Sequence, residues 1–175
     1  MDFRLSSEFE KIIESLNHYK VRYLVVGGIA VNLYGFYRST ADLDIILLLE
    51  DSNLKKFIKA VKKLKLVPRI PVNVEDFANA ELRKIWIKNK NMKAFTLYEP
   101  DFQRKYLDVV IDHPLSFSKS YKQKKVFKDR GLSVPVISFS DLLKMKKSAD
   151  RVRDTIDIMA LKEILEIDHA SKKKK

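Results

Sequence analysis

The chain has 175 residues, 46% of them hydrophobic and 33% charged, which suits one folded domain with a buried core. It contains no cysteine, and this excludes disulfides, thiolate zinc sites and cysteine nucleophiles. No apolar run reaches the roughly 18 residues of a membrane-spanning helix, and the first residues lack the apolar centre of a signal peptide. We therefore predict a cytoplasmic protein without a membrane partner.

The net charge is +12, from 35 Lys and Arg residues against 23 Asp and Glu residues. Such an excess favours contact with a polyanion, either nucleic acid or a triphosphate. Solubility alone explains the charge equally well, so both interpretations stay open at this point. The three histidines have no paired spacing, and a histidine zinc site is not expected.

The first predicted elements are a helix, a buried strand and a second, short helix. Apolar residues recur at helical spacing over about residues 6–19, which predicts an amphipathic helix. The apolar run at 23–26 predicts a buried strand that ends at Gly27 and Gly28. A short helix follows this glycine pair, and the bare N–H groups at a helix N-terminus favour phosphate.

The next strand, predicted over residues 42–49, carries Asp42 and Asp44. Residues two apart in a strand point to the same side, so the two carboxylates are expected to lie next to each other. Two acids that close repel each other unless a cation lies between them. A phosphate site beside a divalent-metal site indicates chemistry on a nucleoside triphosphate.

The rest of the chain continues the mixture of helices and strands. Helices are predicted over about 51–64, 75–88 and 116–124, from 140 onward, and over 151–167, with strands over 94–98, 106–111 and 134–137. The strand at 134–137 is expected at a sheet edge, because Pro135 cannot donate to a ladder. The predicted fold class is α/β (α+β), a mixed sheet flanked by helices, with C-terminal helices closing a cleft.

This pattern also predicts the division of the chain. We expect a single domain over residues 1–170, with a core at about 20–137 and a helical C-terminal part at about 138–168. The lysine-rich end, residues 171–175, is expected to be a disordered basic tail.

A third carboxylate is expected from the strand at 106–111, where Asp108 lies within an apolar run. Three acids from two strands can bind two divalent cations through oxygen ligands. Two metals can activate an attacking hydroxyl and stabilise a leaving pyrophosphate. Asp112 is the alternative third acid, but it lies at the strand's end beside His113 and Pro114, and we therefore prefer Asp108.

The pattern of the glycine pair, then Arg38-x-Thr40-x-Asp42-x-Asp44, then Asp108, resembles the nucleotidyltransferase superfamily of DNA polymerase β. Within it, the chain looks most like the small prokaryotic group related to AbiEii-type toxins. The segment 146–158, KKSADRVRDTIDI, resembles the late motif of that group. The resemblance covers about residues 22–50, 105–112 and 140–160, and the superfamily's usual serine is replaced by Gly28.

The resemblance implies roles for individual residues. Asp42, Asp44 and Asp108 would be catalytic and would bind two Mg²⁺ or Mn²⁺ ions, with an NTP as the substrate. Nucleotide binding would fall to Gly27, Gly28, Arg38, Thr40, Lys146, Arg151 and Asp154.

Several of these roles have structural alternatives. Arg38 could contact phosphate or pair with Asp42. Lys146 competes with two neighbouring lysines, Lys144 and Lys147. On the last helix, the acids Asp154 and Asp157 could simply pair with the arginines Arg151 and Arg153.

The function implied is a metal-dependent nucleotidyltransferase that moves an NMP from an NTP to an acceptor hydroxyl. By resemblance to the toxins, the acceptor would be tRNA or a protein, and a cognate antitoxin would be a further partner. A small-molecule acceptor stays open. The alternatives are a non-catalytic module of the same fold that binds nucleic acid, and an interaction subunit that binds a toxin–antitoxin partner.

Overall fold

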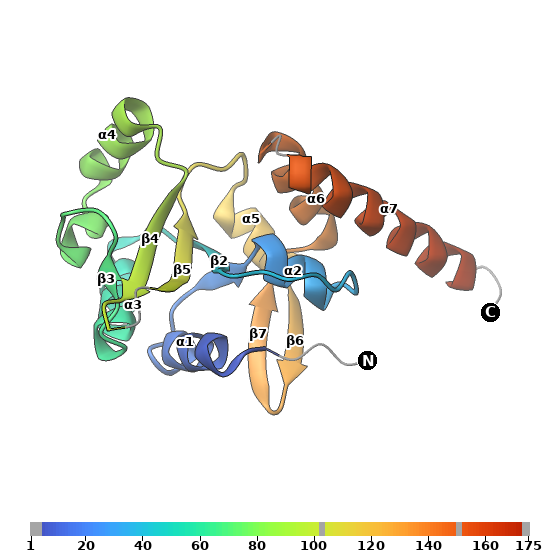
Figure 1. Cartoon of the computed structure of the whole chain (residues 1–175), viewed down its shortest axis with the longest axis horizontal. Helices are drawn as coiled ribbons and strands as arrows, with labels where there is room; N and C mark the ends of the chain where they lie inside the picture. Colours follow the sequence, from blue (N-terminus) through green and yellow to red (C-terminus); the bar gives the residue numbers. More distant parts are fainter. Residues whose placement is uncertain (1–4, 102–103, 150–151, 173–175) are drawn as a thin grey trace.

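The computed structural model describes residues 5–101, 104–149 and 152–172. A seven-stranded sheet runs through the molecule in the order β3-β4-β5-β2-β1-β7-β6 (Figure 1). Its strands are β1 Tyr23–Val25, β2 Leu43–Leu47, β3 Val67–Pro68, β4 Ala94–Glu99, β5 Arg104–Val110, β6 Lys125–Asp129 and β7 Leu132–Val136.

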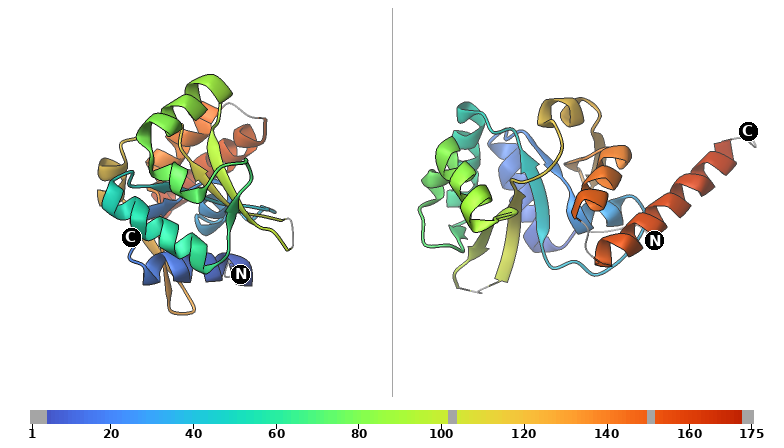
Figure 2. Two further views of the ribbon diagram at one scale, coloured as in Figure 1. Left: turned by 90° about the vertical axis from the view of Figure 1, so that its left-hand side faces the viewer. Right: turned by 90° about the horizontal axis from the view of Figure 1, so that it is seen from above.

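Helices lie on both sides of this sheet, so the predicted fold class is confirmed. They are α1 Ser7–His18, α2 Gly27–Leu33, α3 Asp51–Lys63, the 3₁₀ helix η1 Val74–Ala78, α4 Ala80–Lys90, α5 Phe117–Lys122, α6 Phe139–Ala149 and α7 Val152–Lys172. Figure 2 shows that α7 extends outward from the body, away from the end that carries α3 and α4. None of the helices within the described residues is long and apolar enough to cross a membrane.

The centre of the sheet is apolar and fully covered. β1 is buried at every position, and Leu43, Ile45 and Ile46 of β2 are inaccessible to solvent. Continuous apolar runs of this kind are typical of strands that are covered on both faces. The side chain of Ser15 on α1 donates to Ala60 O on α3 (3.1 Å), which joins the helices that cover one side. The buried sheet therefore supports the polar residues at one end of its central strands β2 and β5.

β2 is antiparallel to β1 and parallel to β5, so it lies between two strands that differ in direction. In the β2–β5 register, Asp44 is directly opposite Asp108. The prediction that acid-bearing strands are neighbours is thus met by the topology.

The C-terminal strands differ from the prediction. β7 is an interior strand between β1 and β6, although it contains Pro135. Its donor to β1 is Ile137, whose N–H bonds to Val25 O (3.0 Å). N–H groups two residues apart in a strand point to the same side, so the donor before Ile137 on the β1 side would be residue 135. Pro135 has no N–H group, and β1 and β7 accordingly share a single register pair. The expected edge position was wrong because β6 supplies the other neighbour.

Other boundaries also differ. β3 and β6 were not predicted, and the helix expected over 75–88 is divided into η1 and α4 at Asn79, whose side chain accepts from Glu81 N (2.9 Å). α7 reaches Lys172, so the start of the expected tail is helical, and residues 173–175 lie outside the described part of the chain.

Candidate active site

The three predicted acids come together at one end of β2 and β5. Asp42 directly precedes β2, Asp44 is its second residue, and Asp108 is opposite Asp44 on β5. Neighbouring strands are about 4.8 Å apart, and paired residues project from the same face. The carboxylates of Asp44 and Asp108 therefore leave the sheet next to each other.

Burial and like charges raise the pKa of the Asp44 carboxyl to about 7. Burial is the largest cause, followed by the negative charges of Asp108 and Asp42, while the backbone N–H of Gly28 and the charge of Lys146 oppose the rise. Oδ1 of Asp108 is buried and accepts no hydrogen bond from any residue that the structure describes. The charge of Lys146 thus does not offset burial and the two neighbouring acids at Asp44.

The donor set suits a hard cation, because carboxylate oxygens are the ligands that Mg²⁺ and Mn²⁺ prefer. Within the described residues, however, no three acidic or histidine side chains are arranged so that they could hold one metal ion.

The glycine pair is required by close contacts with this cluster. Gly27 has φ +63°, and a Cβ there would lie 2.0 Å from Asp44 Oδ2. A Cβ on Gly28 would lie 2.5 Å from Thr40 Oγ1. The Thr40 hydroxyl thus fills the space that a serine at position 28 would need, which explains this departure from the superfamily pattern.

The loop between α2 and β2 is clamped by Asn32, a buried residue on α2. Its Nδ2 donates to Arg38 O (2.9 Å), and its Oδ1 accepts from Arg38 N (3.0 Å). Thr40 Oγ1 in turn donates to Asp42 O (3.3 Å). Sequence analysis missed Asn32; the available signal was a polar residue in the otherwise apolar short helix GGIAVNL.

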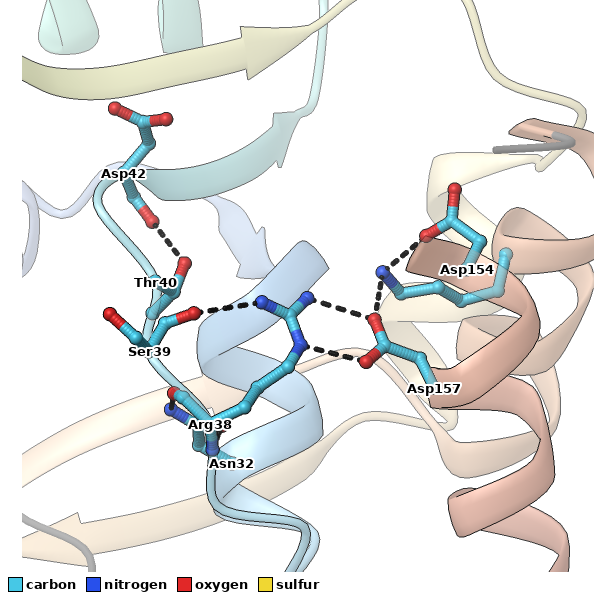
Figure 3. A network of polar contacts seen from close by, with 8 residues as sticks. Asn32, Arg38, Ser39, Thr40, Asp42, Asp154 and Asp157 are labelled. Carbon is cyan, nitrogen blue, oxygen red and sulfur yellow. Dashed lines mark hydrogen bonds and ion pairs between the residues drawn. The ribbon is translucent and has the colours of Figure 1, made fainter. Parts of the chain in front are cut away.

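Acids of α7 hold Arg38 and Lys146. Figure 3 shows the guanidinium of Arg38 facing the Asp157 carboxylate. The guanidinium of Arg38 binds Asp157 at both Nε–Oδ1 (2.7 Å) and Nη2–Oδ2 (2.8 Å), and Nη1 donates to Ser39 O (3.1 Å). Lys146 Nζ contacts Asp154 Oδ1 and Asp157 Oδ2, both at 2.7 Å. The structure therefore pairs Arg38 with Asp157, where sequence analysis considered Asp42 or phosphate.

This ion network is electrostatically balanced. Burial alone would raise the pKa of the Asp157 carboxyl, but hydrogen bonds from Arg38 and Lys146 and their charges outweigh it and lower the pKa below its usual value. The side chains of Arg151 and Arg153, the predicted partners of these acids, lie outside the residues whose side chains are described.

A cavity of about 390 Å³ joins the acid cluster and the ion network. Its lining contains every predicted site residue that the structure describes, together with groups from β4, β5 and α6, while Arg151 lies outside the described residues. These lining residues are Val26, Gly27, Gly28, Arg38, Thr40, Ala41, Asp42, Asp44, Lys93, Ala94, Asp108, Val110, Leu142, Met145, Lys146, Ala149 and Asp154.

The residues considered as alternatives lie elsewhere. Asp112 is not in the lining and forms an ion pair with Lys93. Lys144 pairs with Asp141 (3.0 Å), and Lys147 is exposed and outside the lining. A wider hollow of about 820 Å³ near η1 has no comparable acid cluster. The 390 Å³ cavity is therefore the candidate active site.

Solved structures of two antibiotic-modifying enzymes and of a nucleotidyltransferase-like protein have a similar architecture. The lincosamide antibiotic adenylyltransferase LnuA, with lincomycin bound, is 18% identical, covers 93% of this chain and 99% of its own, and has a TM-score of 0.60. ANT(2″)-Ia in complex with adenylyl-2″-tobramycin is 11% identical, with 94% of each chain covered and a TM-score of 0.52. An antigenic nucleotidyltransferase-like protein from Paracoccidioides brasiliensis is 14% identical, with 93% of this chain and 77% of that one covered and a TM-score of 0.53.

At these identities the likeness shows the fold alone. Residues 3–172 match a family model, and the chain belongs to that family, described as nucleotidyltransferase of unknown function (DUF6036). No curated protein matches the sequence. The superfamily part of the predicted resemblance is thus confirmed, whereas these comparisons give no support to its AbiEii-type part.

Proposed function

We propose that this protein is a metal-dependent nucleotidyltransferase that moves an NMP from an NTP to an acceptor hydroxyl. The observation that carries the proposal is the in-register pair of Asp44 and Asp108, with Asp42 close enough to help raise the pKa of Asp44. Holding like charges together costs free energy, and groups with strongly shifted pKa values cluster at functional sites.

Asp42, Asp44 and Asp108 would hold the metal, which we expect to be two Mg²⁺ or Mn²⁺ ions. Once bound, the ions would neutralise the developing negative charge and make the acceptor hydroxyl a better nucleophile. Rotation of the acid side chains on binding would complete the ligand set that the described residues do not form on their own.

The chain's remaining groups would hold the triphosphate. Gly27 and Gly28 line the cavity at the start of α2, and the Thr40 hydroxyl lies beside Gly28. Arg38 and Lys146 supply positive charge at the cavity wall, and Asp154 holds Lys146. Arg151 keeps its predicted role as a further nucleotide contact.

In the transfer, the acceptor oxygen would form a bond to the α-phosphorus while the bond from phosphorus to the pyrophosphate oxygen breaks. The proton of the acceptor hydroxyl would pass to the Asp108 carboxylate, and pyrophosphate would leave with the electron pair of the broken bond. The products are a nucleotidylated acceptor and pyrophosphate, which balances atoms and charge.

For the acceptor, the net charge of +12 favours a polyanion, and we infer RNA, with a tRNA 3′ end as the first candidate. A protein acceptor and a cognate antitoxin follow from the toxin resemblance alone. A small-molecule acceptor is supported by the structure of LnuA with lincomycin bound and by that of ANT(2″)-Ia in complex with adenylyl-2″-tobramycin. We also place the activity in the cytoplasm, where NTPs are available.

The test is label transfer from each α-³²P NTP with Mg²⁺ or Mn²⁺, using total tRNA, cell lysate, lincomycin and tobramycin as acceptors. Asp44→Asn should abolish transfer, and Asp112→Asn, which removes an acid outside the cavity, should keep it. A lack of transfer to every acceptor, together with a lack of metal-dependent NTP binding, would rule the enzyme out. RNA binding that persists in Asp44→Asn without any transfer would favour the non-catalytic module.

A further inference from the structure

Asp157 has an unusual position for a helix carboxylate. Its side chain is completely inaccessible to solvent, yet it contacts two cations that come from different parts of the chain. Arg38 lies 119 positions away, in the loop that leads to the acid cluster, and Lys146 lies on α6. One carboxylate therefore joins α7, α6 and the α2–β2 loop.

The contacts fix the orientation of both cations. Two parallel hydrogen bonds hold the guanidinium plane of Arg38, since Nε and Nη2 bind the two oxygens of Asp157. An ammonium group has three donors, and Asp157 and Asp154 take two of those on Lys146. Among the described residues, these contacts leave one donor of Lys146 and two donors of Arg38 unused, and both residues line the cavity.

We propose that Asp157 is a positioning residue that aims the free donors of Arg38 and Lys146 at the triphosphate of the bound NTP. Asp157 does not line the cavity, so it acts through these two cations and does not contact the nucleotide. The inference rests on the proposed function, because it assumes that an NTP occupies the cavity.

The same contact supports the catalytic loop. Asn32 holds the backbone of Arg38, and Asp157 holds its side chain, so the loop is fixed from two sides. Thr40 and then Asp42 follow within four residues, and Thr40 Oγ1 bonds to Asp42 O. Loss of the Asp157 charge should therefore loosen the loop as well as the two cations.

Asp154 is the natural comparison, because it is three residues away on the same helix and also binds Lys146. It lines the cavity and is not bonded to Arg38 in any contact that the structure gives. Asp154→Asn leaves Lys146 anchored by Asp157, whereas Asp157→Asn releases Arg38 and half of the Lys146 contact. The two substitutions should therefore differ in their effect on NTP binding.

The experiment uses the full chain with Asp157→Asn, Asp154→Asn and Asp141→Asn. Asp141 is a buried acid bonded to Ser120 (2.7 Å) and Lys144 outside the cavity, so its variant reports general loss of stability. For each we would measure KM and kcat for the NTP, equilibrium binding of Mg²⁺–NTP, and hydrogen exchange of residues 36–41.

Asp157→Asn should raise KM for the NTP by about tenfold or more, with a smaller change in kcat, and should speed exchange in the loop. Asp154→Asn should raise KM by about threefold, and Asp141→Asn should leave it within about twofold. In an Arg38→Met, Lys146→Met background, Asp157→Asn should add no further loss, because it acts only through those cations.

Two results would overturn the proposal: unchanged NTP affinity and loop exchange in Asp157→Asn, or an equal rise in KM for Asp141→Asn. If Asp157→Asn does not fold, Arg38→Lys removes the two-point contact but keeps the charge, and it should raise KM in the same direction. If the wild type binds no NTP, the proposed function fails, and unchanged loop exchange in the variants would separately refute the positioning role.

Discussion

Buried carboxyl groups on the two sides of the cavity have pKa values that are shifted in opposite directions. On the β2–β5 side, burial and neighbouring acids raise the pKa of Asp44 to about 7. On the α7 side, Asp157 is fully inaccessible to solvent, yet its pKa is lowered because Arg38 and Lys146 face it. The α7 side balances its charges by itself, so we expect it to hold and position the nucleotide and not a metal ion. The acid side leaves positive charge to be supplied by a ligand, and that is where we expect chemistry.

The largest expected effect comes from removing a charge on the acid side. Asp44→Asn and Asp108→Asn should each lower the rate of nucleotide transfer by about 1,000-fold or more, because a metal ligand is lost from the site. Single-turnover label transfer at saturating Mg²⁺ measures this directly. Residual activity above one tenth of the wild type in both variants would contradict the assignment.

Asp44→Asn should also stabilise the metal-free protein. A carboxyl whose pKa is higher in the folded than in the unfolded chain destabilises the fold above the folded pKa, here about 7, and not below the unfolded value. At pH 8 the variant should therefore melt about 5 °C higher than the wild type, with little difference at pH 4. Calorimetry with a chelator present checks both values, and equal melting temperatures at pH 8 would mean that the cluster carries no strain.

On the α7 side the stability effect should have the opposite sign. Asp157→Asn leaves two cations without their shared buried partner and should lower the free energy of unfolding by about 3–5 kcal/mol. Asp154→Asn should cost about 1–2 kcal/mol, because Lys146 keeps its contact with Asp157. Urea denaturation of both variants gives the comparison, and a larger loss for Asp154→Asn would reverse our assignment of the central residue.

The boundary between the two sides can be tested through the glycine pair. Gly28→Ser should destabilise the protein by about 1–3 kcal/mol, because its Cβ would lie 2.5 Å from Thr40 Oγ1. Thr40→Ala in the same chain should recover at least half of that loss. Melting temperatures of the two single variants and the double variant form the test; additive losses would show that Thr40 is not the obstacle.

Low pH should weaken only the α7 side. The lowered pKa of Asp157 means that its stabilising effect is fully present above its ordinary value of 3.8 and is lost as the pH falls through the lower folded value. Between pH 5 and pH 3 the wild type should thus lose about 1 kcal/mol more than Asp157→Asn does. If the free energy of unfolding changed with pH in the same way for both proteins, the network would not remain ionised.

The sequence predicted those parts of the fold in which the local pattern and the tertiary environment agree. The helix at α1 and the strands at β1, β2 and β5 have clear apolar patterns, and the structure contains all of them. β6 was missed because its sequence, KVFKD, is short and highly charged. β7 was misplaced at a sheet edge because the rule that proline occurs in edge strands does not consider which neighbouring strand needs the N–H group that proline lacks.

The site was predicted less completely, because spacing along the chain cannot give the register between distant strands. The acids and glycines were chosen from their pattern along the chain and Lys146 from the resemblance of its segment to a late motif, and the structure brings them into one cavity. The partner of Arg38 was not predicted, since Asp157 lies 119 positions away and nearer acids offered simpler pairs. Asn32 was missed because its role depends on a backbone bond across the loop.

The parallel register of β2 and β5 also limits how the gene can change in length. Asp44 and Asp108 meet because β2 and β5 are aligned without a shift, and Leu107 and Val109 next to Asp108 are fully buried. Insertion or deletion of one codon within β5 before Asp108 would turn its carboxylate to the opposite face and bring an apolar neighbour to the cavity. Length changes should therefore be confined to the connecting loops.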